Sequence, residues 1–178
     1  MLSSDDRHFV YDLSVVFTRS SINLAETGCN GIYVPQINLA LLCSVRGLPA
    51  MIRALPGSVR DISSLYATVE EIRANFDSEL ILVLDRGFFS QDVMDFLLDK
   101  DVSFVIPARR KFYNVKIGLD EHFFYHNRLI KAGIAKGKYN LYLFEDVTLR
   151  AEEETNIYRM LDEGRIGREE AKKRLERA

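Results

Sequence analysis

Apolar residues in the first third of the chain cluster in runs rich in β-branched and aromatic side chains. These runs predict strands over 8–17, 36–45 and 48–55. An Arg-Gly pair at 46–47 predicts a tight hairpin turn between the second and third strands, and Pro-Gly at 56–57 ends the third. The opening third therefore predicts an antiparallel part of a sheet.

The period of the apolar positions then changes to that of amphipathic helices. A helix that starts near Asp61 or Ser63 presents one apolar face, formed by Ile62, Leu65, Tyr66, Val69, Ile72 and Phe76. A second helix is expected to be capped by Ser90. The side chains that it directs toward the core are Val93, Met94, Leu97 and Leu98. Short apolar runs at 80–84 and 102–106 predict strands covered on both faces, and 139–144 predicts another strand after a loosely patterned region.

The resulting order is strand, strand, strand, helix, strand, helix, strand. A hairpin part followed by helix-connected strands predicts a mixed sheet with helices packed on it, which is an α/β fold. The ribonuclease-H-like arrangement has this order. The last 29 residues differ, since 16 are charged, and Gly164 and Gly167 divide them into two short helices.

Composition narrows the classes of protein that need considering. The 178 residues, 28% charged and 47% hydrophobic, suit a folded domain, and no apolar run approaches the ~20 residues of a membrane helix. The acidic, polar start is unlike a signal peptide, and Cys29 and Cys43 lack metal-ligand spacing, so two reduced thiols in a cytosolic protein are expected. The net charge of −2 argues only weakly against a nucleic-acid binder, because charge can be segregated along a chain.

Two aspartates occupy positions where strands seldom carry acids. Asp12 lies inside the first predicted strand, and Asp85 ends the short apolar run at 80–84. If the two strands are neighbours, the carboxylates converge, and a divalent cation such as Mg²⁺ would relieve their repulsion. Two such ions held ~4 Å apart suit phosphoryl transfer. The plainer alternatives are an Asp12 ion pair with a buried arginine and a capping or turn role for Asp85.

Four short motifs follow one another along the chain: Tyr11-Asp12-Leu13-Ser14, Val45-Arg46-Gly47-Leu48-Pro49, Leu55-Pro56-Gly57-Ser58-Val59-Arg60-Asp61 and Leu84-Asp85-Arg86-Gly87-Phe88-Phe89-Ser90. In this order they resemble the catalytic domain of DDE-type insertion-sequence transposases of bacteria and archaea. The following segment, 104–109, also fits. The resemblance covers a little over half of the chain.

This resemblance implies a ribonuclease-H-like fold and metal-dependent cleavage and joining of DNA ends. Water, then a DNA 3′-hydroxyl, would attack phosphodiesters. Asp12 and Asp85 would be catalytic ligands of Mg²⁺ or Mn²⁺. Asp61 matches a family position without a firm catalytic role and is expected to cap its helix, while Arg86 would contact phosphate or pair with Asp85.

The third catalytic acid of the family is not identifiable. The family pattern is Tyr-x-x-Arg-x-x-x-Glu-x-x-x-x-x-x-Lys, but Leu161 stands where Tyr158 requires an arginine. Arg165 and Glu169 have the spacing of the Arg and Glu in this pattern, but the Tyr and Lys that should flank them are missing. Glu169 is therefore not assigned as the third catalytic acid. Ser58 also stands where the family often has Asn. We expect a truncated piece, with an incomplete catalytic core over 1–148 and a charged helical extension, or the start of an insertion, over 149–178.

A basic segment provides the candidate DNA contacts. The segment from 109 to 138 contains eight Lys or Arg residues and two acids, which gives it a net charge of +6. Aromatic residues are interleaved with the charged ones. Basic side chains beside aromatic rings suit DNA, and the candidates are Arg109, Arg110, Lys111 and Lys116, with Arg86. The alternative is an ordinary basic loop with core aromatics. His122 and His126 have the i, i+4 spacing of helical metal ligands but no third ligand.

Three interpretations of function remain open on these grounds. The first is a transposase catalytic-domain fragment, nearly inactive alone for want of the third carboxylate. The second is a complete ribonuclease-H-like nuclease, and the third is a decayed domain that binds DNA or a full-length transposase. The resemblance also implies DNA as the partner, a possible homodimer, and a prokaryotic cytoplasmic protein at the nucleoid. The lack of a long apolar run predicts no membrane association.

Overall fold

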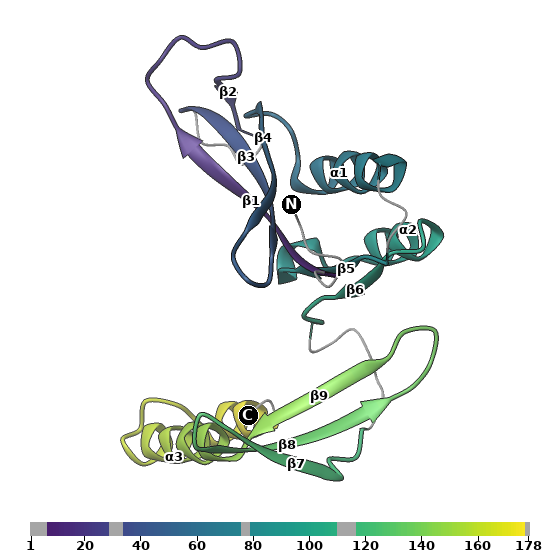
Figure 1. Ribbon diagram of the computed structural model, residues 1–178. Helices are drawn as coiled ribbons and strands as arrows, with labels where there is room; N and C mark the ends of the chain where they lie inside the picture. Colours follow the sequence, from purple (N-terminus) through teal and green to yellow (C-terminus); the bar gives the residue numbers. More distant parts are fainter. Residues whose placement is uncertain (1–6, 29–33, 76–78, 110–116, 177–178) are drawn as a thin grey trace. The chain divides into compact units, whose positions relative to one another are not determined.

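The chain folds as two compact units, which we describe separately. The computed structural model describes residues 7–28, 34–75, 79–109 and 117–176. The first unit spans 1–112 and the second 113–178 (Figure 1).

The first unit is a mixed sheet with two helices. Its strands are β1 (His8–Phe17), β2 (Glu26–Thr27), β3 (Pro35–Ser44), β4 (Pro49–Pro56), β5 (Ile81–Leu84) and β6 (Ser103–Val105). Its helices are α1 (Asp61–Asn75), the 3₁₀ turn η1 (Arg86–Phe88) and α2 (Gln91–Asp99).

The strand order of this sheet is β4-β3-β1-β5-β6, with β2 also paired to β3. β3 runs antiparallel to β1 and β4, while β5 runs parallel to β1 and to β6. Three antiparallel strands followed by two helix-connected parallel strands are the ribonuclease-H-like arrangement, so the predicted fold class is confirmed.

Local sequence signals account for most element boundaries. Gly47 has a φ of +83°, which the β3–β4 turn requires and which glycine adopts without steric cost. Ser90 caps α2 by accepting a hydrogen bond from the Val93 amide at 3.2 Å, as predicted. Asp61 is the first residue of α1, and its acidic side chain lies in the first helical turn.

The core lies between one face of the sheet and both helices. It contains residues from β1, β3 and β5 together with α1 and α2: Phe9, Tyr11, Ala40, Leu42, Leu65, Val69, Ile72, Leu80, Leu82, Leu84, Phe88, Val93, Leu97 and Val102. Leu98 and Ile62 were predicted to point inward but are exposed, because each lies at the edge of its helix's buried stripe.

The prediction that 80–84 and 102–106 are covered on both faces is wrong within this unit. Ile81 and Val83 are only half-buried, and Val105 is 59% exposed. The reason is that α1 and α2 pack on the same face, and β6 is an edge strand. Val10, Val16 and Ile52 on the other face are exposed as well.

The second unit is a three-stranded antiparallel sheet with two helices. It contains β7 (Glu121–Tyr125), β8 (Arg128–Ala135), β9 (Leu141–Asp146), α3 (Val147–Asp162) and α4 (Arg168–Leu175). The strand order is β7-β8-β9. The two predicted C-terminal helices are present, and Gly164, with a φ of +70°, lies in the turn that follows the first of them.

The second unit also departs from prediction in one place. The region before 139 was predicted to be irregular, but it holds the β7–β8 hairpin. Within the described ranges, no helix has the length and apolarity needed to cross a membrane.

Candidate active site

The β1–β5 ladder brings the two strand aspartates to adjacent positions. Tyr11 pairs with Leu84 as the last register pair of these parallel strands. Asp12 and Asp85 are the next residues of the two chain segments, although 72 residues lie between them in sequence. The neighbouring-strand condition on which the metal hypothesis depended is therefore met.

Backbone geometry directs both side chains away from the helices. Tyr11 and Leu84 are buried on the helix face, with exposed fractions of 1% and 3%. Side chains alternate along an extended backbone, and Asp85 stays extended with φ −78° and ψ 173°. Asp12 and Asp85 are accordingly exposed on the opposite side of the sheet.

Each carboxylate accepts one hydrogen bond from a residue two positions later. The Ser14 hydroxyl donates to Asp12 Oδ2 at 3.3 Å. The Gly87 amide donates to Asp85 Oδ1 at 2.7 Å, which caps η1. The turn role considered for Asp85 is thus real, and it leaves Oδ2 without a protein partner in the described part of the chain. The buried-arginine alternative for Asp12 is not observed, since no described ion pair includes it.

Of the two roles considered for Arg86, an ion pair with Asp85 is not seen among the described residues. It begins η1 directly after Asp85 and is exposed. Among the described residues it forms no ion pair with Asp85, so its guanidinium stays accessible to other anions. This is compatible with a phosphate contact.

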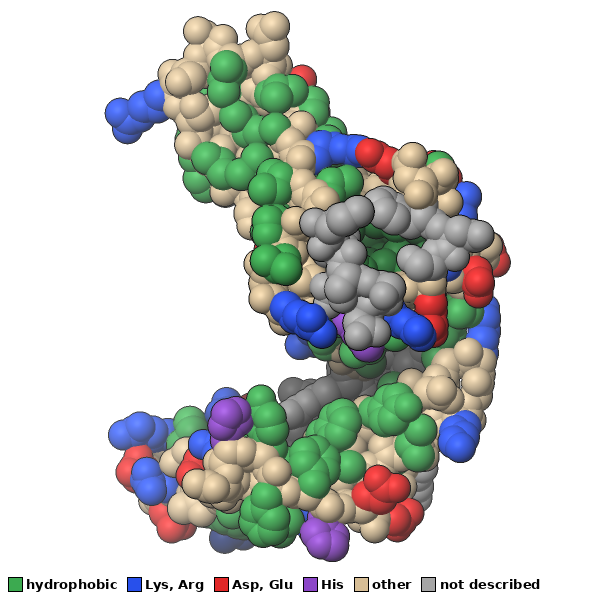
Figure 2. All heavy atoms as spheres, in the orientation of Figure 1, with side chains coloured by type: hydrophobic (Ala, Val, Ile, Leu, Met, Phe, Trp, Pro, Cys, Tyr) green, Lys and Arg blue, Asp and Glu red, His purple; other side chains and the backbone are tan. Residues whose placement is uncertain are grey.

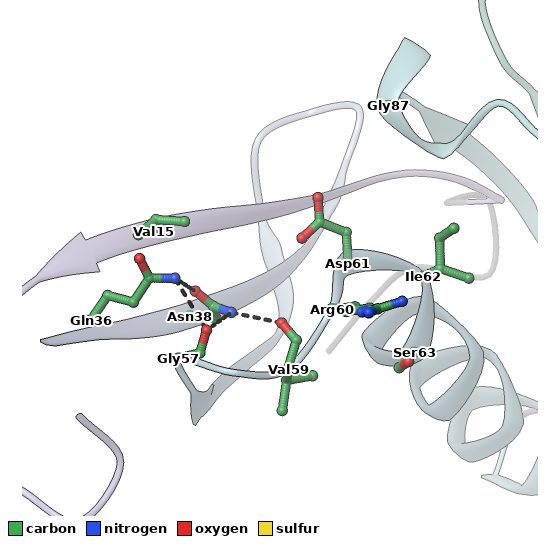
Figure 3. Close-up of a pocket in the computed structure, with 10 residues that line it drawn as sticks. All are labelled: Val15, Gln36, Asn38, Gly57, Val59, Arg60, Asp61, Ile62, Ser63 and Gly87. Atoms are coloured by element: carbon green, nitrogen blue, oxygen red, sulfur yellow. Dashed lines mark hydrogen bonds between the residues drawn. The ribbon is translucent and has the colours of Figure 1, made fainter. Parts of the chain in front are cut away.

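A hollow of about 520 Å³, lined by both polar and apolar residues, lies on the helix side of the sheet (Figure 3). Asp61 and Gly87 both line it, which brings the start of α1 beside the turn that follows Asp85. Figure 3 shows the Asp61 carboxylate rising from the start of α1 toward β1.

Two buried amides hold the segment that leads to Asp61. Asn38 donates to the carbonyl oxygens of Gly57 at 3.3 Å and Val59 at 2.8 Å, and Gln36 donates to Gly57 at 3.1 Å. These residues were not singled out from the sequence. The available signal was two amides at alternate positions of an otherwise apolar strand, which points to inward polar groups with fixed partners.

Tyr11, the residue before Asp12, is a buried phenol. Burial raises the pKa of its phenol above the ordinary value, and the hydrogen bond with Ser64 partly opposes that shift. The negative charge of Asp61 raises the pKa further, which places Asp61 within electrostatic reach of Tyr11.

Comparison with family models gives a match over most of the chain. The model described as "Transposase DDE domain" matches residues 4–162. The chain belongs to this family. A search of curated proteins finds no match. Among solved structures, a piggyBac transposase synaptic complex with hairpin DNA matches with 14% identity and a TM-score of 0.43. The match covers 78% of this chain and 32% of that one, so this DDE domain spans about a third of the length of the piggyBac chain.

The donor atoms of this DDE domain suit a hard divalent cation. Two carboxylates at adjacent strand positions are the oxygen ligands that Mg²⁺ and Mn²⁺ take in proteins. Across the described residues, however, no group of three His, Cys, Asp or Glu side chains is arranged to hold a metal ion. Glu169 lies in the first turn of α4 in the second unit. The pair therefore fits a metal but offers two protein ligands.

The basic segment of the DDE domain is only partly described. Arg109 is exposed, while Arg110, Lys111 and Lys116 lie outside the described residues. Arg128 pairs with Asp146 at 3.0 Å, so its charge is engaged within the second unit.

Aromatic side chains of the second unit gather on its sheet rather than in a core. Phe123, Tyr125, Tyr142 and Phe144 are 43–62% exposed, and Figure 2 shows hydrophobic side chains at the surface here. The Phe123 and Phe144 rings meet edge to face at 6.2 Å between centroids. The alternative in which these aromatics form a core is thus not observed for them.

The helical metal-ligand hypothesis for the two histidines is wrong. His122 lies in β7, and His126 lies in the turn after it with a φ of +47°. In a helix the i, i+4 interval brings two side chains within one turn of each other, whereas an extended strand rises about 3.3 Å per residue and separates them more widely. His126 also lies outside the strand, so the spacing does not indicate a shared metal site here.

Proposed function

We propose that this chain is the catalytic domain of a DNA transposase that cleaves and joins phosphodiesters at transposon ends. The observation that carries the proposal is the placement of Asp12 and Asp85 directly after the last β1–β5 pair, in a chain of the DDE family. Two acids converging on a ribonuclease-H-like sheet are the chemistry that this family uses.

Asp12 and Asp85 act as ligands of Mg²⁺ or Mn²⁺ in this proposal. Bound there, the metal would stabilise the attacking and leaving oxygens of the phosphodiester. Ser14 and Gly87 orient the two carboxylates through the hydrogen bonds described above. Arg86, exposed beside Asp85, contacts a phosphate of the DNA backbone.

A third carboxylate is needed for full activity. Within the first unit, the described residues bring no third acid to Asp12 and Asp85, so water must supply more of the metal coordination there. We therefore expect this chain alone to bind the metal weakly and to be inactive, or nearly so, on DNA.

Metal binding provides the first test. Mn²⁺ is titrated into the chain and the free ion is followed by electron paramagnetic resonance. Asp12→Asn and Asp85→Asn each remove a charge but keep a hydrogen-bond acceptor, and each is expected to weaken binding by about tenfold or more, because an anionic ligand is lost. Asp99→Asn, an exposed acid in α2 of the same unit, is the matched control and should bind as the unaltered chain does. Equal affinities for all four proteins would overturn the assignment.

Nicking of DNA provides the second measurement in the same experiment. The chain is incubated with terminal-inverted-repeat DNA and Mg²⁺ or Mn²⁺, and no nicking above background is expected. Robust nicking that Asp12→Ala abolishes would contradict the expected inactivity while supporting the site itself.

A further inference from the structure

Tyr11 lies next to both aspartates, one through the chain and the other through the β1–β5 ladder. It precedes Asp12 in the chain, and its register partner Leu84 precedes Asp85. With 1% exposure it is among the largest fully buried side chains of the protein. It therefore lies directly under the pair of carboxylates, on the other side of the sheet.

The side chain of Tyr11 reaches two further elements. Its hydroxyl donates to Ser64 Oγ at 2.7 Å, which ties β1 to the first turns of α1. Its ring meets Phe88 edge to face, with centroids 5.5 Å apart and planes at 67°. One side chain thus joins the strand of Asp12, the helix that begins at Asp61 and the turn that follows Asp85.

The contact with Phe88 matters because Phe88 belongs to the turn that fixes Asp85. The Phe88 amide donates to the Asp85 carbonyl oxygen at 3.3 Å, and the Gly87 amide donates to the Asp85 carboxylate at 2.7 Å. Phe88 is itself 3% exposed, so it has little room to move independently of the Tyr11 ring. A shift of that ring is transmitted to both hydrogen bonds.

The hydroxyl has a specific part in this arrangement. Packing alone would be satisfied by phenylalanine, whereas a buried phenol requires a hydrogen-bond partner. Ser64, also buried, supplies it. The bond fixes the direction of the ring as well as its depth.

We propose that Tyr11 is a positioning residue that holds Asp12 and Asp85 in their shared geometry, tethered through Ser64 and acting on Asp85 through Phe88. This inference rests on the function proposed above for the two aspartates. It assigns Tyr11 no contact with metal or DNA.

Amide hydrogen exchange in the metal-free chain tests the positioning directly. Tyr11→Phe removes the tether and keeps the ring, and Tyr11→Leu removes both. Exchange at Gly87 and Phe88 should accelerate about threefold in the first variant and more in the second. The Val93 amide, bonded to Ser90 Oγ at the start of α2, should change less and serves as the internal reference for a uniform loss of stability.

Mn²⁺ affinity supplies the functional readout. Tyr11→Phe should weaken binding severalfold, and Ser64→Ala should do the same without adding to it in the double variant, because both remove one bond. Tyr66→Phe is the matched control. It removes a phenolic hydroxyl from the same helix as Ser64, but its ring packs on Phe96 with centroids 4.1 Å apart rather than on Phe88, so no change is expected.

The outcomes separate this inference from the proposed function. If Asp12→Asn and Asp85→Asn leave Mn²⁺ binding unchanged, the proposed metal site is wrong, and the exchange data alone decide the role of Tyr11. If the Tyr11 variants lower stability but speed exchange at Gly87, Phe88 and Val93 equally, Tyr11 is only a core residue and the inference fails.

Discussion

Tyr11 is a phenol in a position that has no access to water, and this gives it a distinct response to pH. Burial raises the pKa of Tyr11 above its ordinary value near 10, since the charged phenolate is poorly solvated there. The folded protein therefore holds the phenolic proton more tightly than the unfolded chain does. The associated stability is complete below about pH 10 and is lost as the pH rises through the raised pKa.

Alkaline unfolding tests this assignment. The free energy of unfolding of the unaltered chain should fall as the pH rises above about 10, and that of Tyr11→Phe should fall less steeply. Urea unfolding at a series of pH values, followed by circular dichroism, gives both curves. Parallel curves would show that Tyr11 contributes nothing to the pH dependence.

Single residues differed in how far the sequence revealed them. Asp12 and Asp85 stood out because an acid in a strand needs a partner or a cation, and the β1–β5 register places them as the hypothesis required. Asn38 and Gln36 carried a weaker signal, because their partners are backbone carbonyls of Gly57 and Val59, which have no side-chain signature. A hydrogen bond between a side chain and the backbone of a distant turn becomes visible only in three dimensions.

At the scale of elements, the predictions succeeded where turn and capping signals were strong. β1 has the predicted bounds, and α2 follows its predicted cap. The β7–β8 hairpin was missed because His126 and Asn127 form its two-residue turn, with φ of 47° and 61°. Such turns are usually marked by Asn-Gly or Asp-Gly. β7 is exposed along its whole length, so no apolar alternation marked it.

The start of α3 gives a prediction for acid pH. Asp146 accepts a hydrogen bond from the Leu149 amide at 2.9 Å and one from Arg128 at 3.0 Å. The bond with the Leu149 amide, followed by that with Arg128, lowers the pKa of the Asp146 carboxyl. Its contribution to stability is present above the unfolded pKa near 4 and is lost as the pH falls through the lowered value.

Asp146→Asn should consequently lower the Tm at pH 7 and have little effect in strong acid. Asparagine keeps the capping oxygen but loses the charge that faces Arg128. Thermal unfolding at pH 7 and below pH 3 measures the difference in Tm between the variant and the unaltered chain at each pH. Asp162→Asn, at the other end of α3, is the matched control. A variant as stable as the unaltered chain at pH 7 would refute this account.

At the scale of the whole molecule, the order of elements predicted a mixed α/β sheet for the first unit, and the resemblance to DDE transposases implied the ribonuclease-H-like arrangement. Antiparallel hairpins and right-handed crossovers leave few arrangements for that order. The coverage of the sheet was harder to predict, because an apolar run such as 80–84 does not reveal how many faces other elements bury.

The proposed DNA contacts belong to this scale as well. Replacing Arg109, Arg110 and Lys111 together by alanine should weaken DNA binding. It should also reduce the slope of log affinity against log salt by about 0.9 for each DNA phosphate that the chain no longer neutralises. Fluorescence anisotropy with a labelled duplex at several salt concentrations measures the slope.

The matched control removes the same charge from α4 by replacing Arg168, Lys172 and Lys173. If both triple variants change the slope equally, general charge rather than the basic segment is responsible. If neither changes it, the segment does not bind DNA.

The parallel β1–β5 pairing also dictates when the two aspartates can meet during synthesis. β1, β3 and β4 can pair as successive hairpins while the chain is still emerging from the ribosome, but β5 joins β1 across more than 60 intervening residues. Because β5 follows these strands and α1 in the sequence, it can join β1 only after they have been synthesised. Asp12 therefore lies in a formed strand before Asp85 reaches it. The two carboxylates become neighbours late, when β5 pairs with β1.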